Sequence, residues 1–226
     1  MNEVESESKP TSVNPYTAGL NVTNTGTVED AENNTVAFEI FHGHNKLLAR
    51  KADAEWATFH ISIFDEIKSK NLPEIEFQEV INSIVMEDSH WSWSNKSWHY
   101  SSTEYEWFFM IMQNQVQGIC VIFHPKNSHL ENGKIFYVEF VAVAPWNRNT
   151  KISARKFKKI GTLLLKQASE YAINSLELKP GFSLLSLPQS ESYYESLGMV
   201  EVVHEKKDGM KFYEMTQSSC ESWGKK

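Results

Sequence analysis

The sequence predicts a mixed α/β (α+β) fold with a largely antiparallel sheet, and three observations support this class. Segments with the two-residue period of strands alternate along the chain with segments that have the three-to-four-residue period of helices. Several strand-like segments follow one another across short turns, which is typical of antiparallel pairing. The chain has 226 residues, 41% of them hydrophobic, which suffices for one sizeable core. We expect a central twisted sheet of about six or seven strands flanked by about four helices.

The N-terminal region differs in composition from the rest of the chain. Residues 1–35 are rich in Asn, Thr, Ser and Glu and follow neither period, so we expect a polar, flexible arm outside the domain. Residues 36–41 (VAFEIF) alternate and predict the first strand. Apolar side chains then recur at three- and four-residue steps over residues 45–70, which predicts a long helix with one apolar face. Pro73 ends it, and a second helix is expected over residues 74–86.

An aromatic segment and three strands form the middle of the chain. Residues 88–106 follow neither period, so we expect a long loop there. Strands are predicted at residues 107–113 and 116–124, joined by a short turn. A longer strand is predicted at residues 135–144, and Pro145 stops it because proline cannot donate to the ladder.

A basic loop separates these strands from the next helix. Residues 146–160 are loop-like, and residues 160–176 have a helical pattern. Residues 182–187 predict a buried strand. Pro188 then opens a helix that ends at Gly198, a residue suited to a helix C-terminus.

The last predicted strands are residues 200–204 and 210–215, which pair around a turn at residues 207–209. We therefore place the domain at residues 36–216 and a polar tail at residues 217–226.

The charge balance and the cysteines disfavour several classes of protein. There are 22 Lys and Arg against 29 Asp and Glu, a net charge of −7, which opposes broad binding to a nucleic-acid backbone. Neither Cys120 nor Cys220 stands in a C-x-x-C pattern, so we expect no metal and no disulfide framework. No segment has the roughly 18 apolar residues of a membrane helix, and the polar N-terminus lacks the apolar region of a signal peptide. We expect a cytoplasmic protein that binds neither nucleic acid nor membranes.

Three segments, in this order, resemble the GCN5-related N-acetyltransferase (GNAT) superfamily, in a bacterial or phage-type branch. They are FYVEFVAVAPWNR at residues 136–148, RKFKKIGTLLL at residues 155–165 and SLPQSESYYESLGM at residues 186–199. With the preceding hairpin they span roughly residues 36–215. The resemblance implies a GNAT-like sheet and direct transfer of an acetyl group from acetyl-CoA to an amine in a ternary complex. The acceptor, a small molecule or a protein amine, stays open, as does a homodimer.

The second segment has features of a phosphate site in its own right. Gly161 lies at the start of a predicted helix, where unpaired N–H groups and the helix dipole favour an anion, and it lets a phosphate approach closely. In the superfamily this loop cradles the coenzyme A pyrophosphate, and the resemblance assigns that role to Lys156, Lys158, Lys159, Ile160, Gly161 and Thr162. Lys159 stands where the family has glycine. Either its ammonium helps to bind the phosphates, as we expect, or its side chain weakens coenzyme binding.

The resemblance implies further cofactor contacts on two strands. The backbone of Val141, Ala142 and Val143 is expected to pair with the pantetheine amides as an added strand. Ser186, at the end of the next strand, is expected to hydrogen-bond the cofactor or a water, and Ser190, on the helix that follows, is expected beside the cofactor.

Two residues are the candidates for proton transfer. Tyr194 lies four residues before Gly198, which resembles the superfamily's Tyr-x-x-x-Gly motif, in which the phenol protonates the departing thiolate. Glu139 is the expected general base, because an acid within the apolar strand YVEFVAV costs free energy unless it is paired or functional. Strand alternation places it on the same face as Val141. A paired carboxylate, or His124 or His99 as the base, are the alternatives.

The aromatic loop contains Trp91, Trp93 and Trp98. They fill the core, form a docking surface for the N-terminal arm, or form an aromatic wall that binds an amine substrate through cation–π contacts. Cys120 is flanked by apolar residues and is expected in the core, not as an acyl carrier.

The alternative to an enzyme is a GNAT-fold module that binds acyl-CoA or a protein without turnover.

Overall fold

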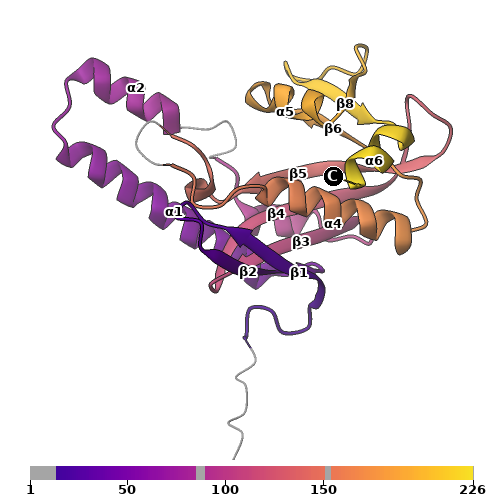
Figure 1. The fold of residues 1–226 in the computed structure, drawn as a ribbon, viewed down its shortest axis with the longest axis horizontal. Helices are drawn as coiled ribbons and strands as arrows, with labels where there is room; N and C mark the ends of the chain where they lie inside the picture. The colour runs from indigo at the N-terminus through magenta and orange to yellow at the C-terminus, as the bar shows by residue number, and fades with distance from the viewer. Residues whose placement is uncertain (1–13, 85–89, 151–153, 226) are drawn as a thin grey trace, which may run out of the picture.

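The computed structural model describes residues 14–84, 90–150 and 154–225, with side chains omitted for residues 82–84. One sheet lies between helices on both of its faces (Figure 1). Its strands are β1 (Asn21–Glu29), β2 (Thr35–His42), β3 (Tyr105–Met112), β4 (Gln115–Asn127), β5 (Lys134–Val143), β6 (Phe182–Ser186), β7 (Val200–Glu201) and β8 (Lys211–Met215). The α-helices are α1 (Lys46–Ser69), α2 (Glu74–Ile84), α3 (Trp93–His99), α4 (Ile160–Asn174), α5 (Glu191–Ser196) and α6 (Gln217–Gly224), and short 3₁₀ turns occupy Pro145–Asn147 and Pro188–Ser190. The mixed α/β class is confirmed, with more elements than expected.

The eight strands lie in the order β1-β2-β3-β4-β5-β6-β8-β7. All neighbours are antiparallel except β5 and β6, which the crossover through α4 makes parallel. The predicted largely antiparallel sheet is therefore confirmed. β5 and β6 pair only from Phe136 to Val138 on β5, although β5 continues to Val143. The rest of β5 has no strand beside it on the β6 side among the described residues.

Two apolar clusters cover the two faces of the sheet. On one face α4 packs through Leu164 and Ala168 against Phe136, and Cys120 is buried in the same cluster as expected. Burial raises the pKa of the Cys120 thiol, which agrees with a core residue. On the other face α1 and α3 bury Trp93 in a second cluster.

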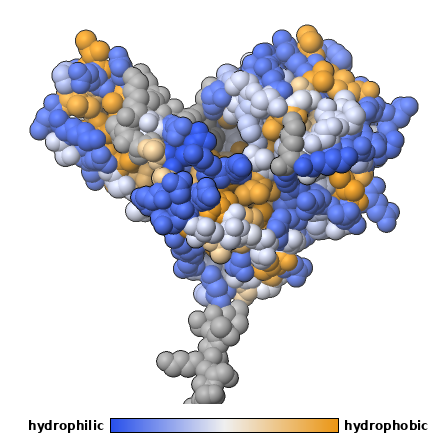
Figure 2. Space-filling view, viewed as in Figure 1, coloured by the Kyte–Doolittle hydropathy of each residue, from blue (hydrophilic) through white to orange (hydrophobic). Residues whose placement is uncertain are grey.

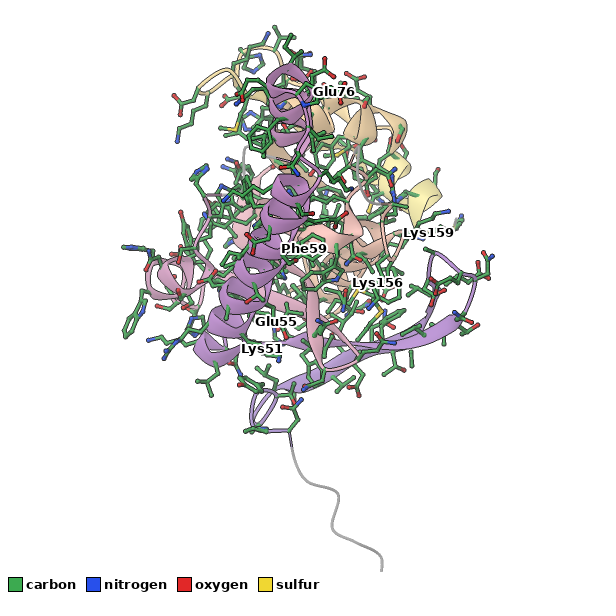
Figure 3. All side chains as sticks on the ribbon, turned by 90° about the vertical axis from the view of Figure 1, so that its left-hand side faces the viewer. Lys51, Glu55, Phe59, Glu76, Lys156 and Lys159 are labelled. Atoms are coloured by element: carbon green, nitrogen blue, oxygen red, sulfur yellow. The ribbon has the colours of Figure 1, made fainter. Side chains whose placement is uncertain are left out.

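Helix α1 is fixed to the sheet by polar as well as apolar contacts. Lys51, Glu55 and Phe59 follow one another along its length (Figure 3). The Lys51 Nζ lies 2.8 Å from a Glu55 carboxylate oxygen, and the other Glu55 oxygen accepts the Val116 N–H at 2.9 Å. Phe59 packs edge-on against Trp146, with ring centroids 5.6 Å apart. The far half of α1 projects beyond the sheet with α2, and a notch separates this hairpin from the part that carries α5 and β8 (Figure 2).

The prediction of a polar, flexible arm is wrong for residues 21–29. These residues form β1, which pairs with β2 from Thr35 to His42. An edge strand has polar side chains on both faces, so the sequence NVTNTGTVE shows no hydrophobic alternation. Residues 1–13 lie outside the described residues.

Two short helices also replace expected irregular segments. Residues 93–99 of the predicted loop form α3, which Ser92 caps by accepting the Asn95 N–H. Residues 217–224 of the predicted tail form α6, capped by Thr216 and docked through buried Cys220 and Trp223. Helices of seven and eight residues are too short to display a clear period. None of the helices in the described ranges is both long and apolar enough to cross a membrane.

Candidate functional site

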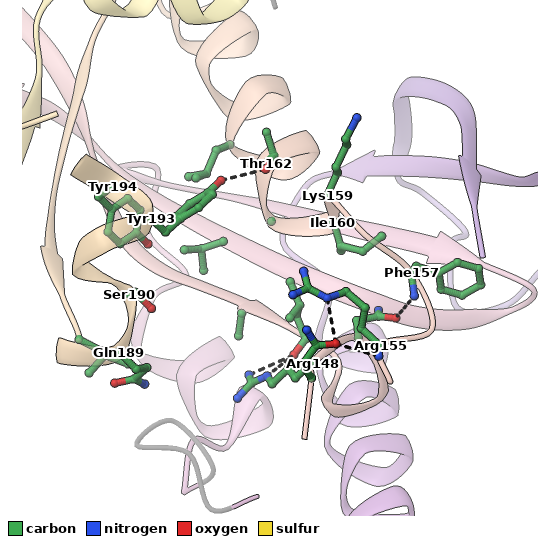
Figure 4. A pocket seen from close by; sticks show the side chains of 18 residues that line it. Arg148, Arg155, Phe157, Lys159, Ile160, Thr162, Gln189, Ser190, Tyr193 and Tyr194 are labelled. Atoms are coloured by element: carbon green, nitrogen blue, oxygen red, sulfur yellow. Dashed lines mark hydrogen bonds between the residues drawn. The ribbon is translucent and has the colours of Figure 1, made fainter. Parts of the chain in front are cut away.

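A cavity of about 410 Å³ opens where β5 and β6 diverge, between the start of α4 and the start of α5 (Figure 4). We call it the cationic cavity. Nine residues predicted from the sequence line it: Val141, Ala142, Val143, Lys159, Ile160, Gly161, Thr162, Ser190 and Tyr194. The predicted cofactor strand, phosphate loop and tyrosine therefore meet in one place.

The start of α4 offers unpaired backbone donors to this cavity. Lys159 is the N-cap residue, and no side chain in the described ranges caps the helix. The first intrahelical bond to the N-cap runs from the Leu163 N–H to the Lys159 carbonyl, and the N–H groups of residues 160–162 have no acceptor among the described residues. A Cβ on Gly161 would lie 3.6 Å from the nearest atom, Val143 Cγ1, so the space above Gly161 is open. This geometry suits an anion.

Lys159 adopts the left-handed conformation, with φ of 66°. This conformation favours glycine, which agrees with the glycine that the resemblance expects at this position. The Lys159 side chain is exposed and extends away from Gln189 and Ser190 (Figure 4).

Two arginines that were not among the predicted site residues also line the cationic cavity. The Arg155 backbone N–H and Nε each donate to Asn149 Oδ1 at 3.2 Å. The Arg148 guanidinium donates to the Val143 carbonyl, at 3.1 Å from one terminal nitrogen. Together with Lys159 they supply three cations, and no carboxylate of the described residues lines this cavity. Arg148 stands in the quoted PWNR segment and Arg155 opens the basic run, so the sequence contained the signal.

The loop before α4 is held by the sheet and by the β1–β2 turn. Phe157 is buried, its N–H donates to Asn147 Oδ1 at 3.2 Å, and its backbone forms a bridge with Asp30. Asn147 in turn donates to the side-chain oxygen of buried Gln117 at 3.0 Å. These contacts fix the loop that leads to the unpaired N–H groups.

Tyr194 lies on α5 with 7% of its surface exposed. Burial raises the pKa of its phenol, so it stays protonated at neutral pH. Gly198, with φ of 85°, ends the helix, and the Met199 N–H donates to the Tyr194 carbonyl at 3.2 Å. The adjacent Tyr193 also lines the cavity, but its hydroxyl hydrogen-bonds Thr162 Oγ1 at 2.9 Å. Of these two phenols in the described structure, only that of Tyr193 is hydrogen-bonded to the phosphate loop.

The expected orientation of Glu139 is wrong. Opposite β4, Phe140 pairs with Val121 and Val138 pairs with Ile122, so Glu139 is the extra residue of a β-bulge. The bulge breaks the strand alternation. Val141 packs toward α4, whereas Glu139 interacts electrostatically with Lys96 of α3, on the opposite side of the sheet. Glu139 does not line the cationic cavity.

Glu139 is half-buried among charged groups. Burial raises the pKa of its carboxyl, and Lys96, Lys126 and Lys207 partly offset this rise. A carboxyl with a raised pKa accepts a proton more readily than an ordinary one.

A second cavity, of about 280 Å³, lies on the α1 and α3 side of β5. We call it the aromatic cavity because Trp56, Trp91 and Trp93 line it. It also contains Asp53, whose carboxylate accepts four hydrogen bonds from Ser92, Trp93 and Ser94 and so fixes the start of α3. Ala142 and Arg148 line both cavities, which therefore adjoin at the end of β5.

The three predicted tryptophans have different surroundings. Trp93 is 1% exposed and is both a core residue and a wall of the aromatic cavity, and Trp91 is a half-buried wall. Trp98 is 67% exposed and lines neither cavity.

Several other predicted residues are not brought to the cavities. Lys156 Nζ donates to Gln113 Oε1 at 3.2 Å on the β3–β4 turn, and exposed Lys158 lines neither cavity. Ser186 is fully buried and its hydroxyl donates to the Leu187 carbonyl. The alternative bases His99 and His124 also lie outside both cavities.

No family model matches the chain, and no curated protein matches it. Solved structures do. The Campylobacter jejuni N-acetyltransferase PseH is 13% identical with a TM-score of 0.37, over 70% of this chain and 89% of its own. An acyl-CoA N-acyltransferase from Pseudomonas aeruginosa is 12% identical with a TM-score of 0.42, over 65% of this chain and 94% of its own.

A variant of the toxin AtaT, bound to the C-terminus of the antitoxin AtaR and acetyl-CoA, is 13% identical with a TM-score of 0.40, over 54% of this chain and 73% of its own. The chain is thus similar to solved N-acetyltransferases at low identity. Because these TM-scores lie below 0.5, the functional assignment rests on the two cavities themselves.

Proposed function

We propose that this protein is a GNAT-type N-acetyltransferase that transfers an acetyl group from acetyl-CoA to an amine. One observation carries the proposal: in the part of the chain that the structure describes, the unpaired stretch of β5 and the uncapped start of α4 meet in a cavity with three cations and no carboxylate. An extended amide chain that ends in a pyrophosphate has the matching chemistry, because its amides pair with a strand and its phosphates with helix N–H groups.

The proposed donor site uses residues from both ends of the cationic cavity. The N–H groups of residues 160–162 bind the pyrophosphate, and Arg148 and Arg155 add positive charge. The β5 backbone from Val141 to Val143 pairs with the pantetheine amides. Lys159 contributes charge from the exposed rim.

The acceptor amine approaches from the aromatic cavity. Its lone pair attacks the thioester carbonyl, the carbon–sulfur bond breaks, and the thiolate takes a proton from the Tyr194 phenol. Glu139 removes the proton from the attacking nitrogen, directly or through water. The acceptor is a small molecule or a protein amine.

A second candidate is an acyl-CoA-binding or protein-interaction module without turnover. The position of Glu139 outside both cavities favours it, since a base has to reach the attacking nitrogen. The two candidates share the donor site and differ in turnover.

The donor site is tested with Gly161→Ala and isothermal titration of acetyl-CoA. The added methyl group fits the fold, since it would lie 3.6 Å from Val143 Cγ1, but it occupies the space above the helix N–H groups. We expect affinity to fall at least tenfold, or about 1.4 kcal/mol, with no loss of stability. Gly224→Ala is the matched control, because a Cβ there meets no atom within 4 Å.

Equal affinity in Gly161→Ala and the wild-type chain, or no binding of acetyl-CoA at all, would contradict the donor site. Binding without acetyl transfer to any member of an amine panel would favour the module over the enzyme.

A further inference from the structure

We propose that Lys96 is a site of self-acetylation, and that its Nζ accepts the acetyl group of acetyl-CoA held in the cationic cavity. The inference rests on the proposed function and adds to it a substrate amine within the chain.

The first argument is the position of Lys96 on α3. Its Nζ lies 3.4 Å from the centre of the Phe140 ring and 4.5 Å from the centre of the Trp91 ring. Trp91 lines the aromatic cavity, and Phe140 lies two residues before Ala142, which lines both cavities. Two residues of strand span about 6.6 Å. The Lys96 amine therefore lies beside the strand that separates the cavities, on the acceptor side.

The second argument is the chemistry of this amine. Lys96 is half-buried, and burial lowers the pKa of its ammonium to about 8, although the charge of Glu139 acts in the opposite direction. At pH 7.5 a pKa of about 8 leaves roughly a quarter of the side chains neutral, against about one in a thousand for an ordinary lysine. Only the neutral amine is a nucleophile.

The step is balanced without a further reactant. The neutral Nζ attacks the thioester carbonyl, a carbon–nitrogen bond forms, and the carbon–sulfur bond breaks. The nitrogen loses one proton, the thiolate takes up one proton, and the products are an uncharged amide and coenzyme A.

Lys46 provides a control within the same chain. Its Nζ lies 3.3 Å from the centre of the Trp98 ring, so it makes the same kind of contact. Neither lysine itself lines either cavity, but Lys46 and Trp98 are both exposed, whereas Lys96 is half-buried against Trp91, which lines the aromatic cavity. A cation–π contact alone therefore predicts equal reactivity of the two lysines, whereas position and burial predict that Lys96 reacts faster.

Acetylation would also change the surroundings of Glu139. The groups that act on Glu139 or feel its charge come from several elements: Lys96 on α3, Tyr100 directly after α3, Tyr105 on β3, Lys126 on β4, Tyr137 on β5 and Lys207 on the β7–β8 turn. The Lys96 charge lowers the pKa of Glu139, so its loss raises that pKa. Because Glu139 is the proposed base, acetylation of Lys96 should shift the acid limb of the pH–rate profile, over which turnover falls, to higher pH.

The test is to incubate the full chain with acetyl-CoA and to follow acetylation of each lysine by peptide mass spectrometry. We expect Lys96 to be acetylated at least tenfold faster than Lys46. The rate should rise tenfold per pH unit below about pH 8 and level off above it. Tyr194→Phe should slow this reaction and leave the labelling of Lys96 by acetic anhydride unchanged. Lys96→Arg should abolish the modified peptide.

Isothermal titration of acetyl-CoA, run in parallel, separates the two proposals. If acetyl-CoA binds and Lys96 reacts no faster than Lys46, self-acetylation is overturned and the donor site stands. If acetyl-CoA does not bind, the proposed function is overturned and self-acetylation with it. If Lys96 is acetylated at the same rate in Tyr194→Phe as in the wild-type chain, acetyl transfer assisted by Tyr194 is overturned. The reaction of Lys96 with acetyl-CoA would then reflect only the intrinsic reactivity of its amine.

Discussion

The two faces of β5 have different chemistry, although the same ten residues form both. Toward α4, three cations and unpaired backbone groups surround a cavity that has no carboxylate among its described lining residues. Toward α1 and α3, aromatic side chains surround a second cavity, with half-buried Glu139 and Lys96 nearby on the same side. The bulge at Glu139 makes this difference, because it directs an acid away from the face that an anion would occupy. One strand can therefore separate an anion site from an amine site.

The largest expected effect concerns the α4 face. Tyr194→Phe removes only the buried hydroxyl, so acetyl-CoA should bind with unchanged affinity while turnover falls by about 10²–10⁴-fold, the range for loss of a general acid. Isothermal titration measures the affinity for acetyl-CoA. Assays that are stopped at fixed times, with the best acceptor amine, measure turnover. Tyr193→Phe is the control, because its hydroxyl bonds Thr162. Unchanged turnover in Tyr194→Phe would remove this residue from the proposed role.

A smaller effect is expected on the opposite face. Glu139→Gln should lower turnover at neutral pH by about 10²-fold, because the amide cannot accept the proton. In the wild-type chain, turnover should fall as pH drops through the raised pKa of Glu139, since protonation removes the base. This acid limb should be absent in Glu139→Gln. A pH–rate profile that keeps the limb would assign the base to another residue.

The smallest effect concerns Lys159, whose left-handed backbone is costly for a residue with a Cβ. Lys159→Gly should raise the free energy of unfolding by about 1 kcal/mol in urea denaturation. Lys159→Asn tolerates the same conformation and also lacks the charge. If the ammonium helps to bind phosphates from the rim, both variants should weaken acetyl-CoA binding equally, by up to about fivefold, as for an exposed charge. Tighter binding in Lys159→Gly would show instead that the side chain obstructs the coenzyme.

Strong periodicity and motif spacing predicted much of this architecture. The apolar face over residues 45–70 forms α1, and the strand patterns at residues 107–124 form β3 and β4. The spacing from Tyr194 to Gly198 predicted the end of α5 and the tyrosine that lines the cavity. These features depend on neighbours in sequence, which is why the sequence contained them.

The errors concern features that depend on distant residues. A bulge is set by pairing between strands, so alternation alone placed Glu139 on the wrong face. Helix α3 begins where Asp53, about 40 residues earlier, accepts the N–H groups of Trp93 and Ser94. Arg148 and Arg155 both stand in segments with a recognisable pattern, but only the fold brings the two arginines to one cavity beside β5.

Strand β1 has a consequence for the behaviour of the chain in concentrated solution. Its partner β2 carries buried Phe38, Ile40 and Phe41, whereas β1 itself is largely Asn and Thr. An uncovered apolar strand edge is a template for pairing with other molecules and leads to aggregation. A chain shortened to begin after Glu29 would expose the edge of β2. The polar stretch whose composition suggested disorder is therefore the cover that keeps one copy of this sheet from joining the next.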